Sequence, residues 1–394
     1  MTGVSFPKVY LAIDNCFASK RFTEPEDWVR IIKSLGINFI EASADSECDP
    51  LYQGEDYLKR WVDIVRKATL QNDMKVCNLY SGHGTYSTLG LAHSDPSVRE
   101  RMLEKWLKPM ADVAASLGAG LGFFCHAFSD RVLQDPELYK EYSDILIKNL
   151  SELTRYAHSV GCEYAGVEQM YSPHQIPWTI EGAKEIIRKV SNTAQEPFFV
   201  TIDTGHQSGQ FGFLKPGREK ILDACNKIRE YGTVNHLWLG PETCYRMLEN
   251  CRSFSPGRIQ SVVNEMSREM DKFPYLFASS RDTSTYTWLE DLAVYSPIIH
   301  LQQTNGNVSA HWPFTRSNNE KGIIEGIKLL KAVKYSFECQ EDIKIQKVDK
   351  IFLTLEVFAS TGSINYDTIN DLRESVRYWR QFIPEDGIPL DELI

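Results

Sequence analysis

Four residues of the chain have side chains that could together hold one divalent cation: Glu168, Asp203, His300 and Glu356. Each lies at or near the end of a short apolar run, and the four runs follow one another along the chain. Three carboxylates and one imidazole suit Mn²⁺, Mg²⁺, Co²⁺ or Zn²⁺, and geometry rather than affinity alone would select the ion. Burying three carboxylates together without a cation would be costly. A single glutamate at such a position is as often a partner of a helix N-terminus, so the metal-site prediction depends on the whole set.

The elements that must position these side chains alternate between strand and helix. Each expected strand is short, rich in Val, Ile, Phe or Leu, and nearly continuous in hydrophobicity, which is typical of a strand buried on both faces in a parallel sheet. The strand candidates are Val9–Asp14, Ile37–Ser43, Lys75–Ser81, Leu121–Ser129, Tyr164–Met170, Phe198–Thr204, Pro297–Thr304 and Lys350–Phe358.

Helical spacing of apolar residues fills the connections between these strands. In the first connection Trp28, Ile31 and Leu35 share one face, and Gly36 marks the helix end. Further helices are expected at Glu55–Thr69, Ser97–Leu117, Leu138–Val160 and Ile180–Ser191. Repeated strand-then-helix units predict an α/β fold, and eight of them favour a closed (β/α)₈ TIM barrel, whose catalytic residues come from the carboxyl ends of the strands.

The rival architecture is an open doubly wound sheet. It would call for a glycine-rich phosphate turn after the first strand, where Asp14-Asn15-Cys16-Phe17 stands instead. We expect a single TIM-barrel domain over residues 1–394, with one irregularity. The sixth and seventh strands are about ninety residues apart, where a single helix would need roughly thirty. The extra stretch, approximately residues 207–284, is predicted to be an insertion on the C-terminal face, either a lid or an oligomer contact.

Composition narrows the classes of function. A hydrophobic content of 42% with 24% charged residues is typical of a globular protein. The formal charge of −10 argues against a nucleic-acid partner, whose phosphates call for a basic surface. Neither a signal peptide at Met1–Lys8 nor a membrane span is apparent, and the nine cysteines form no Cys-x-x-Cys pair. These features predict a cytoplasmic protein with free thiols and no membrane partner.

Four short motifs resemble the xylose isomerase-like TIM-barrel superfamily, which contains sugar and sugar-phosphate isomerases and epimerases. The motifs are Val167-Glu168-Gln169-Met170, the Asp-x-x-His signature Asp203-Thr204-Gly205-His206, His300-Leu301-Gln302-Gln303-Thr304 and Leu355-Glu356-Val357. The resemblance covers most of the chain, from about Val9 to Phe358, apart from the insertion. Short motifs of this kind identify the superfamily far better than the substrate.

The resemblance implies a role for each matched residue. Glu168, Asp203, His300 and Glu356 would bind one divalent metal ion, and the two glutamates would also serve as acid and base on either side of the substrate. His206 would contact a substrate oxygen. The implied reaction removes a proton next to the carbonyl of a small sugar or sugar phosphate and returns it, through an enediolate. Epimerisation and aldose–ketose isomerisation both remain open.

Three positions depart from the family pattern. Gln303 stands where many relatives have Asp, Gly306 stands where the ketose 3-epimerases place a substrate arginine, and His174 stands where those epimerases have a second glutamate. The end of the site that binds the substrate is therefore this chain's own, and a free ketohexose is not inferred.

Further residues near the strand ends are candidates for substrate binding, and each has a structural alternative. His83 and Glu41 could instead belong to loop structure and helix capping, and His126 could be a core histidine. His174 and Trp178 follow Glu168 and could instead pack at the barrel rim. His311 lies in a loop after the seventh strand and could reach a ligand.

Three classes of function remain. The first is the metal-dependent isomerase or epimerase. The second is a lyase, such as a dehydratase of an inosose-like ring, or a phosphoesterase on the same barrel. The third is a non-catalytic sugar-binding barrel. The predicted partner is a small carbohydrate substrate, and a homo-oligomer is compatible with each class.

Overall fold

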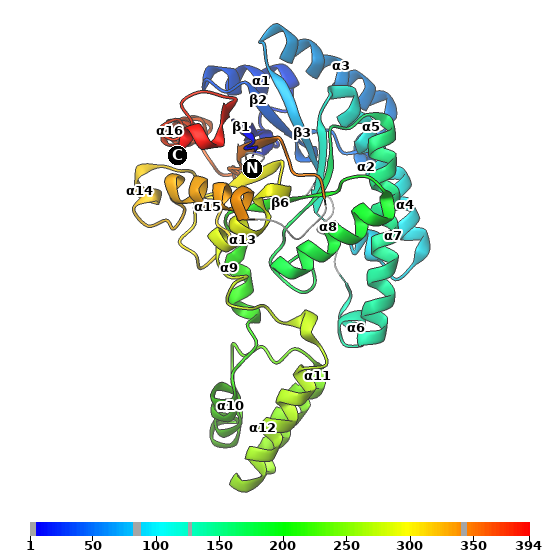
Figure 1. Ribbon diagram of the computed structural model, residues 1–394, viewed down its shortest axis with the longest axis vertical. Coiled ribbons are helices and arrows are strands. Elements are labelled where there is room, and N and C mark those ends of the chain that lie inside the picture. The colour runs from blue at the N-terminus through cyan, green and yellow to red at the C-terminus, as the bar shows by residue number, and fades with distance from the viewer. Residues whose placement is uncertain (1–4, 82–87, 125–127, 340–344) are drawn as a thin grey trace.

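Eight parallel strands close into a barrel, which confirms the predicted fold class. The computed structural model describes residues 5–81, 88–124, 128–339 and 345–394. Each strand pairs with the next along the chain, and β1 pairs with both β8 and β2, which closes the ring (Figure 1). The strands are β1 Lys8–Asp14, β2 Phe39–Ser43, β3 Lys75–Ser81, β4 Gly120–Phe124, β5 Ala165–Glu168, β6 Phe199–Asp203, β7 Ile298–Leu301 and β8 Lys350–Leu355. A short strand, β9 at Ile388–Pro389, lies antiparallel to β1.

Five strands, β4 to β8, end earlier than their hydrophobicity predicts, and β7 and β8 illustrate why. β7 ends at Leu301 and β8 at Leu355, three residues before the predicted Thr304 and Phe358. The segments that follow remain mostly buried although they have left the sheet. Burial at the barrel mouth therefore extends the hydrophobic pattern beyond the last ladder hydrogen bond.

Helices cover the outside of the barrel, and α1 (Pro25–Ser34) illustrates why. Proline occupies its first turn together with two acidic residues, and the buried side chains of Trp28, Val29 and Ile32 form one apolar face. The chain then turns through Gly36 at φ +80°. The other helices of the barrel are α2 Pro50–Gln53, α3 Glu55–Gln71, α4 Pro96–Met102, α5 Lys108–Leu117, α6 Asp130–Leu133, α7 Pro136–Val160, α8 Ile180–Ala194, α13 Thr285–Leu292, α14 Arg316–Asn319, α15 Gly326–Cys339, α16 Asn365–Trp379 and α17 Leu390–Leu393.

The helix predicted over Ser97–Leu117 is interrupted. A π-helical turn at Leu103–Leu107 separates α4 from α5, and Pro109 follows in the first turn of α5. Proline has no N–H to donate to the preceding turn, which accounts for a local widening of the helix.

Aromatic side chains fill the amino-terminal end of the barrel. The ring of Tyr10 lies 4.9 Å from that of Phe39 and 5.0 Å from that of Phe352, measured between centroids. These residues pack with Ala12 and Ile298. Because aromatic side chains fill this end of the barrel, polar active-site residues are expected at the opposite end, at the carboxyl ends of the strands.

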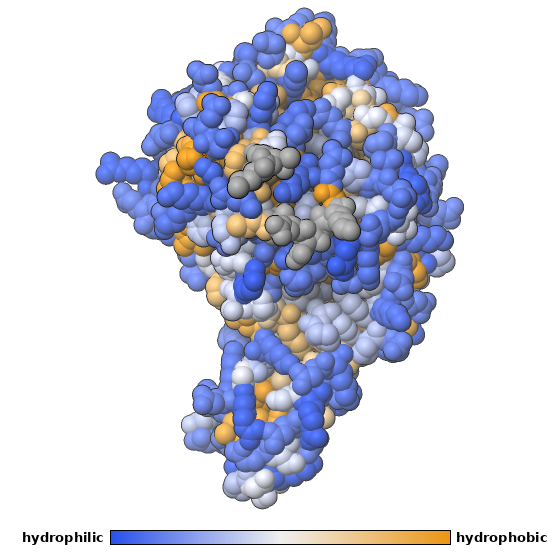
Figure 2. All heavy atoms as spheres, in the orientation of Figure 1, coloured by the Kyte–Doolittle hydropathy of each residue, from blue (hydrophilic) through white to orange (hydrophobic). Residues whose placement is uncertain are grey.

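The long connection between β6 and β7 contains a projecting group of helices (Figure 1). After α9 (Gln207–Gln210), the helices α10 (Arg218–Tyr231), α11 (Glu242–Asn250) and α12 (Pro256–Met270) pack around a hydrophobic cluster separate from that of the barrel. Hydrophilic residues cover most of the face in Figure 2, including the outside of these helices. The chain leaves and rejoins the barrel at one place, where Leu214 pairs with Ala278. A role as lid or oligomer contact stays a prediction.

None of the helices in the described part of the chain combines the length and apolar character that a membrane span requires.

Candidate metal centre and active site

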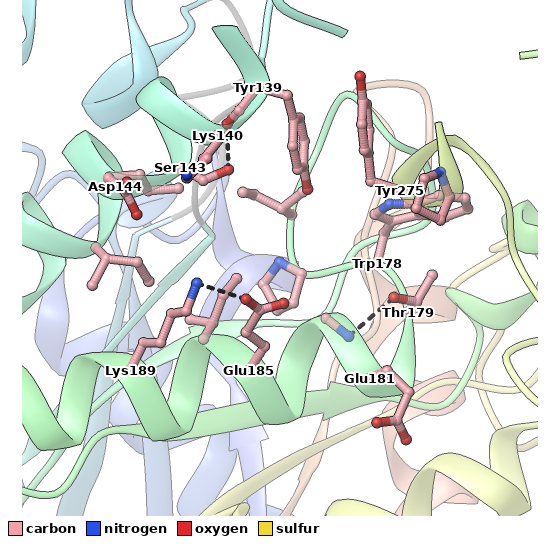
Figure 3. A pocket seen from close by; sticks show the side chains of 17 residues that line it. Tyr139, Lys140, Ser143, Asp144, Trp178, Thr179, Glu181, Glu185, Lys189 and Tyr275 are labelled. Atoms are coloured by element: carbon pink, nitrogen blue, oxygen red, sulfur yellow. Dashed lines mark hydrogen bonds and ion pairs between the residues drawn. The ribbon is translucent and has the colours of Figure 1, made fainter. Parts of the chain in front are cut away.

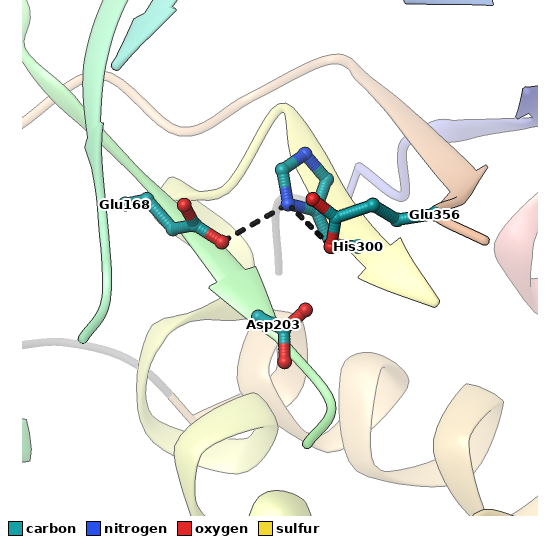
Figure 4. A group of neighbouring side chains, drawn as sticks. All are labelled: Glu168, Asp203, His300 and Glu356. Atoms are coloured by element: carbon teal, nitrogen blue, oxygen red, sulfur yellow. Dashed lines mark hydrogen bonds and ion pairs between the residues drawn. The ribbon is translucent and has the colours of Figure 1, made fainter. Parts of the chain in front are cut away.

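Four neighbouring strands bring the predicted ligands together at the barrel mouth (Figure 4). Glu168 and Asp203 are the last residues of β5 and β6, His300 lies within β7, and Glu356 directly follows β8. One ligand atom from each of the four lies within 4.8 Å of the others, and all four side chains are buried. The register supports this convergence, because Asp203 is the Cα partner of His300 across β6 and β7.

The imidazole of His300 lies in the middle of a set of carboxylates. Its Nδ1 is 3.1 Å from Oε1 of Glu168 and 3.6 Å from Oε2 of Glu356. Its Nε2 is 2.7 Å from Oε1 of Glu41, which comes from β2 and is fully buried. The two ring nitrogens therefore face different carboxylates.

Asp203 has one oxygen fully engaged and one without a partner. Its Oδ1 accepts from the backbone N–H groups of Gly205 at 2.7 Å and His206 at 2.9 Å, and from the amide of Gln302 at 2.7 Å. A side chain at Gly205 would collide with Gln302, since a Cβ there would lie 2.4 Å from its amide carbon. Among the described residues, Oδ2 has no hydrogen-bond partner although it is buried. The Asp203–His206 turn therefore holds the carboxylate with one oxygen open to a ligand.

Glu168 and Glu356, the two predicted acid–base residues, each have a polar partner of their own. The hydroxyl of Tyr80 donates to Oε2 of Glu168. Nδ1 of His311 lies 3.2 Å from Oε2 of Glu356, and the ring of Phe358 packs against His311 edge-on at 4.8 Å. The pair with Glu356 raises the pKa of His311 to about 9, although burial opposes this.

Burial has the largest influence on the pKa of His300, Asp203 and Glu356, and neighbouring charges of opposite sign oppose it. Burial alone would lower the pKa of His300, but the surrounding carboxylates, Glu41 foremost, raise it well above its usual value. Burial alone would raise the pKa of Asp203, but nearby histidines, His206 foremost, lower it to about 2. For Glu356 burial prevails over the histidines and raises the pKa. The histidines therefore outweigh burial at Asp203 but not at Glu356.

The donor set fits one hard or borderline cation. Among the described residues, five buried carboxylates group with His300, and charges of one sign are stable there only when paired. They belong to Asp14, Glu41, Glu168, Asp203 and Glu356. Carboxylate oxygens with one imidazole nitrogen are ligands for Mn²⁺, Mg²⁺, Co²⁺ or Zn²⁺. The unpartnered Oδ2 of Asp203 gives such an ion an available donor.

The remaining predicted site residues fall into three groups. His206, His311 and Glu41 border the four-residue group. Nδ1 of His206 donates to the carbonyl of Gln169 at 2.7 Å, and its Nε2 lies 3.8 Å from Oδ1 of Asp203. His83 and His126 lie outside the described residues.

The structure does not bring His174 and Trp178 to this group. Nδ1 of His174 lies 3.3 Å from the carbonyl of Phe128. Trp178 packs against Phe213 and lines a pocket of about 450 Å³ beside α7 and α8, together with Tyr275 (Figure 3). Their contact with substrate stays a prediction.

Sequence reasoning missed Tyr80. A tyrosine inside an apolar strand resembles a core residue, and only its place next to the last residue of β3 indicated the barrel mouth. Gln303 stands at the position of the family aspartate. Its side-chain amide donates to Asn319 and to the carbonyl of Ile324, and not to the four predicted metal ligands.

A model of the family described as "Xylose isomerase-like TIM barrel" matches residues 29–232, more than half of the chain. The chain belongs to the xylose isomerase-like TIM barrel family. A curated relative from Brucella abortus (strain 2308), D-erythrulose 1-phosphate 3-epimerase, is 21% identical over 366 residues, which cover 92% of this chain and 93% of the relative.

Solved structures share this family fold. A putative xylose isomerase from Rhodospirillum rubrum has a TM-score of 0.68 at 15% identity, with 95% of this chain and 99% of that one covered. A D-allulose 3-epimerase from Methylomonas sp., in complex with D-allulose, has a TM-score of 0.53 at 12% identity, with 96% and 99% covered. At these identities the likeness shows the fold.

Proposed function

We propose that this chain is a divalent-metal-dependent epimerase or isomerase of a small sugar or sugar phosphate. The observation that carries the proposal is the convergence of Glu168, Asp203, His300 and Glu356 within 4.8 Å at the carboxyl ends of the strands. Membership of a family that contains sugar epimerases supports it.

The proposed reaction moves a proton next to a carbonyl. Glu168, held by the hydroxyl of Tyr80, and Glu356, beside His311, are the two proton carriers: one carboxylate removes the proton and the other returns it. Return to the opposite face of the same carbon gives epimerisation, and return to the neighbouring carbon gives isomerisation. A divalent ion held by the four residues would polarise the sugar oxygens and stabilise the negative charge that develops.

His206 is proposed to bind a substrate oxygen through Nε2. Its Nδ1 carries a proton, because it donates to the carbonyl of Gln169, and this fixes the ring. The ring packs edge-on against Tyr171 at 5.1 Å and stays almost fully buried beside Asp203. A substrate oxygen that binds beside Asp203 would therefore find Nε2 of His206 already oriented toward it.

The curated relative favours a phosphorylated substrate as the first to test. That relative is a 3-epimerase of D-erythrulose 1-phosphate, and the match spans nearly the full length of both chains. The cytoplasmic location and the possible homo-oligomer remain predictions.

Deuterium incorporation from solvent tests the proposal. The Mn²⁺-loaded chain is incubated in D₂O with ketoses and ketose phosphates, D-erythrulose 1-phosphate among them. The masses of the recovered sugars are then measured by mass spectrometry. We expect a carbon-bound deuterium with at least one sugar, and a loss of about 10²-fold or more in Glu168→Gln and Glu356→Gln. Glu181→Gln, on an 85% exposed side chain, is the control that keeps the rate. No incorporation by the wild type, or incorporation that survives Glu356→Gln, contradicts the proposal.

The alternatives give other products in the same mixtures. A dehydratase yields a product lighter by one water, and a phosphoesterase releases inorganic phosphate. A non-catalytic binding protein gives no product with any metal and keeps its sugar affinity in Glu168→Gln.

A further inference from the structure

Two buried carboxylates lie on opposite sides of the His300 ring. Oε1 of Glu41 is 2.7 Å from Nε2, and Oε1 of Glu168 is 3.1 Å from Nδ1. Glu41 and His300 are both fully buried, so water does not compete for this contact. Nδ1 is the nitrogen that faces the proposed cation ligands, and Nε2 is the one that faces away from them.

A neutral imidazole has one nitrogen with a lone pair and one that carries hydrogen. A metal takes the lone pair, and the hydrogen bond made by the other nitrogen decides which tautomer is present. We infer that Glu41 is a positioning residue that accepts the Nε2–H of His300 and so presents the Nδ1 lone pair to the divalent ion. This inference rests on the metal site of the proposed function and goes beyond it, because Glu41 is placed behind the ligand instead of in contact with the substrate.

The sheet holds Glu41 in this position. Within β2, Glu41 is the Cα partner of Asp14 on one side and of Asn78 on the other. The pairing of β2 with β3 shifts register between Ile40 and Glu41, which leaves Cys77 as an extra residue on β3. Such bulges occur at barrel rims and beside active sites, where they re-aim side chains. Backbone pairing on both sides therefore fixes the direction from which Glu41 approaches the ring.

A second cation bound by Asp14, Glu41 and His300 is the competing interpretation, since their ligand atoms also lie within 4.8 Å of one another. The distance of 2.7 Å between Nε2 and Oε1 favours a hydrogen bond, and the number of ions bound per chain separates the two interpretations. The contact is that of an N–H donor with a carboxylate acceptor.

Zn²⁺ binding and histidine NMR of the full chain test the inference together. Zn²⁺ is diamagnetic, so the ring nitrogens of His300 can be observed in the loaded protein, with His300→Gln providing the assignment. Glu41→Met keeps the length of the side chain and removes the acceptor. Glu41→Gln keeps a neutral acceptor. Asp14→Asn alters a buried carboxyl group next to Glu41, whose pKa burial raises, and leaves the contact between Glu41 and Nε2 of His300 in place, so it controls for a local change in the same cluster.

We expect the loaded wild type to show a slowly exchanging proton on Nε2 and metal-bound Nδ1. Glu41→Met should weaken Zn²⁺ binding by about 10- to 100-fold, the usual effect of losing the partner of a metal-bound histidine. Glu41→Gln should lose less affinity, and its Nε2 proton should exchange faster. Asp14→Asn should keep the Nε2 proton as in the wild type.

Several outcomes would overturn the inference. They are a proton on Nδ1 in the loaded wild type, two Zn²⁺ ions per chain, or wild-type affinity and proton exchange in Glu41→Met. Should Glu41→Met fail to fold, wild-type values in Glu41→Gln would overturn it equally. A wild type that binds no divalent ion contradicts the proposed function as well, whereas a wild type that binds one ion while the Glu41 variants match it contradicts this inference alone.

Discussion

Gln302 donates its side-chain amide to Oδ1 of Asp203 at 2.7 Å, while its own Oε1 accepts from the backbone N–H of His311 at 2.6 Å. One side chain therefore fixes both a proposed metal ligand and the loop that carries the partner of Glu356. Hydrogen bonds to ligating carboxylates orient them and set their affinity for the ion.

Replacement of Gln302 should affect both ends of this link. In Gln302→Met we expect divalent-metal affinity to fall by about tenfold, because Asp203 loses its amide donor. Calorimetric titration with Mn²⁺ measures the loss. Gln303→Met is a matched control, since Gln303 is equally buried but bonds to Asn319 and Ile324. Both variants should lose about 1–3 kcal/mol of unfolding free energy, because each leaves buried groups without partners. Equal metal affinities in the two variants would show that Gln302 acts only on stability.

Removal of the Tyr80 hydroxyl should impair the reaction more than the fold. In Tyr80→Phe, Glu168 loses a hydrogen-bond donor, so we expect the deuterium-incorporation rate to fall by about tenfold or more while the free energy of unfolding changes by about 1 kcal/mol. Tyr164→Phe removes a hydroxyl that donates to the carbonyl of Cys77 in the same barrel, and should keep the rate. A wild-type rate in Tyr80→Phe would remove Tyr80 from the proposed mechanism.

Metal affinity should weaken as pH falls. The raised pKa of His300 means that the ring carries an extra proton in the metal-free chain at neutral pH, and a cation on Nδ1 must displace it. Each proton displaced changes the apparent affinity by about tenfold per pH unit. Titrations between pH 6 and pH 8, in buffers with different heats of ionisation, give the number of protons released. A metal affinity that does not change with pH, with no proton released on binding, would contradict the extra proton on the His300 ring of the metal-free chain.

The projecting helices should be dispensable for the fold of the barrel. The backbone of Leu214 pairs with that of Ala278 where the connection leaves and rejoins the barrel, and Nζ of Lys215 lies 2.5 Å from Oδ1 of Asp271, so a short Gly/Ser linker can replace residues 217–270. The hydrophobic cluster of α10–α12 is separate from that of the barrel, and we expect the shortened chain to keep its barrel circular dichroism and its metal affinity. Aggregation, or loss of metal binding with the barrel intact, would show that the insertion contributes to the site.

Much of the fold could be predicted from the sequence, because strands buried on both faces are continuous in hydrophobicity and closed barrels place chemistry at strand ends. That rule selects Glu168 and Asp203, which are the last residues of their strands. It overestimates strand length where burial continues past the sheet, as at Val357, which is buried although β8 has ended at Leu355.

Contacts between elements could not be predicted in the same way. The side of His300 from which Glu41 approaches depends on a register shift between β2 and β3, which no local pattern reveals. Trp178 follows Glu168 by ten positions, yet the chain has left the mouth by then and packs Trp178 against Phe213 from the long connection. Proximity in sequence is therefore a poor guide to the residues that line the site.

Anomalous diffraction from Mn²⁺-loaded crystals tests the central claim most directly. A barrel that holds its ion through Glu168, Asp203, His300 and Glu356 predicts one strong peak per chain, within coordination distance of a carboxylate oxygen from each acid and of Nδ1 of His300. The peak should disappear in crystals of Asp203→Ala grown under the same conditions. No peak at the barrel mouth of the wild type, or a peak that these four side chains do not surround, would contradict the account.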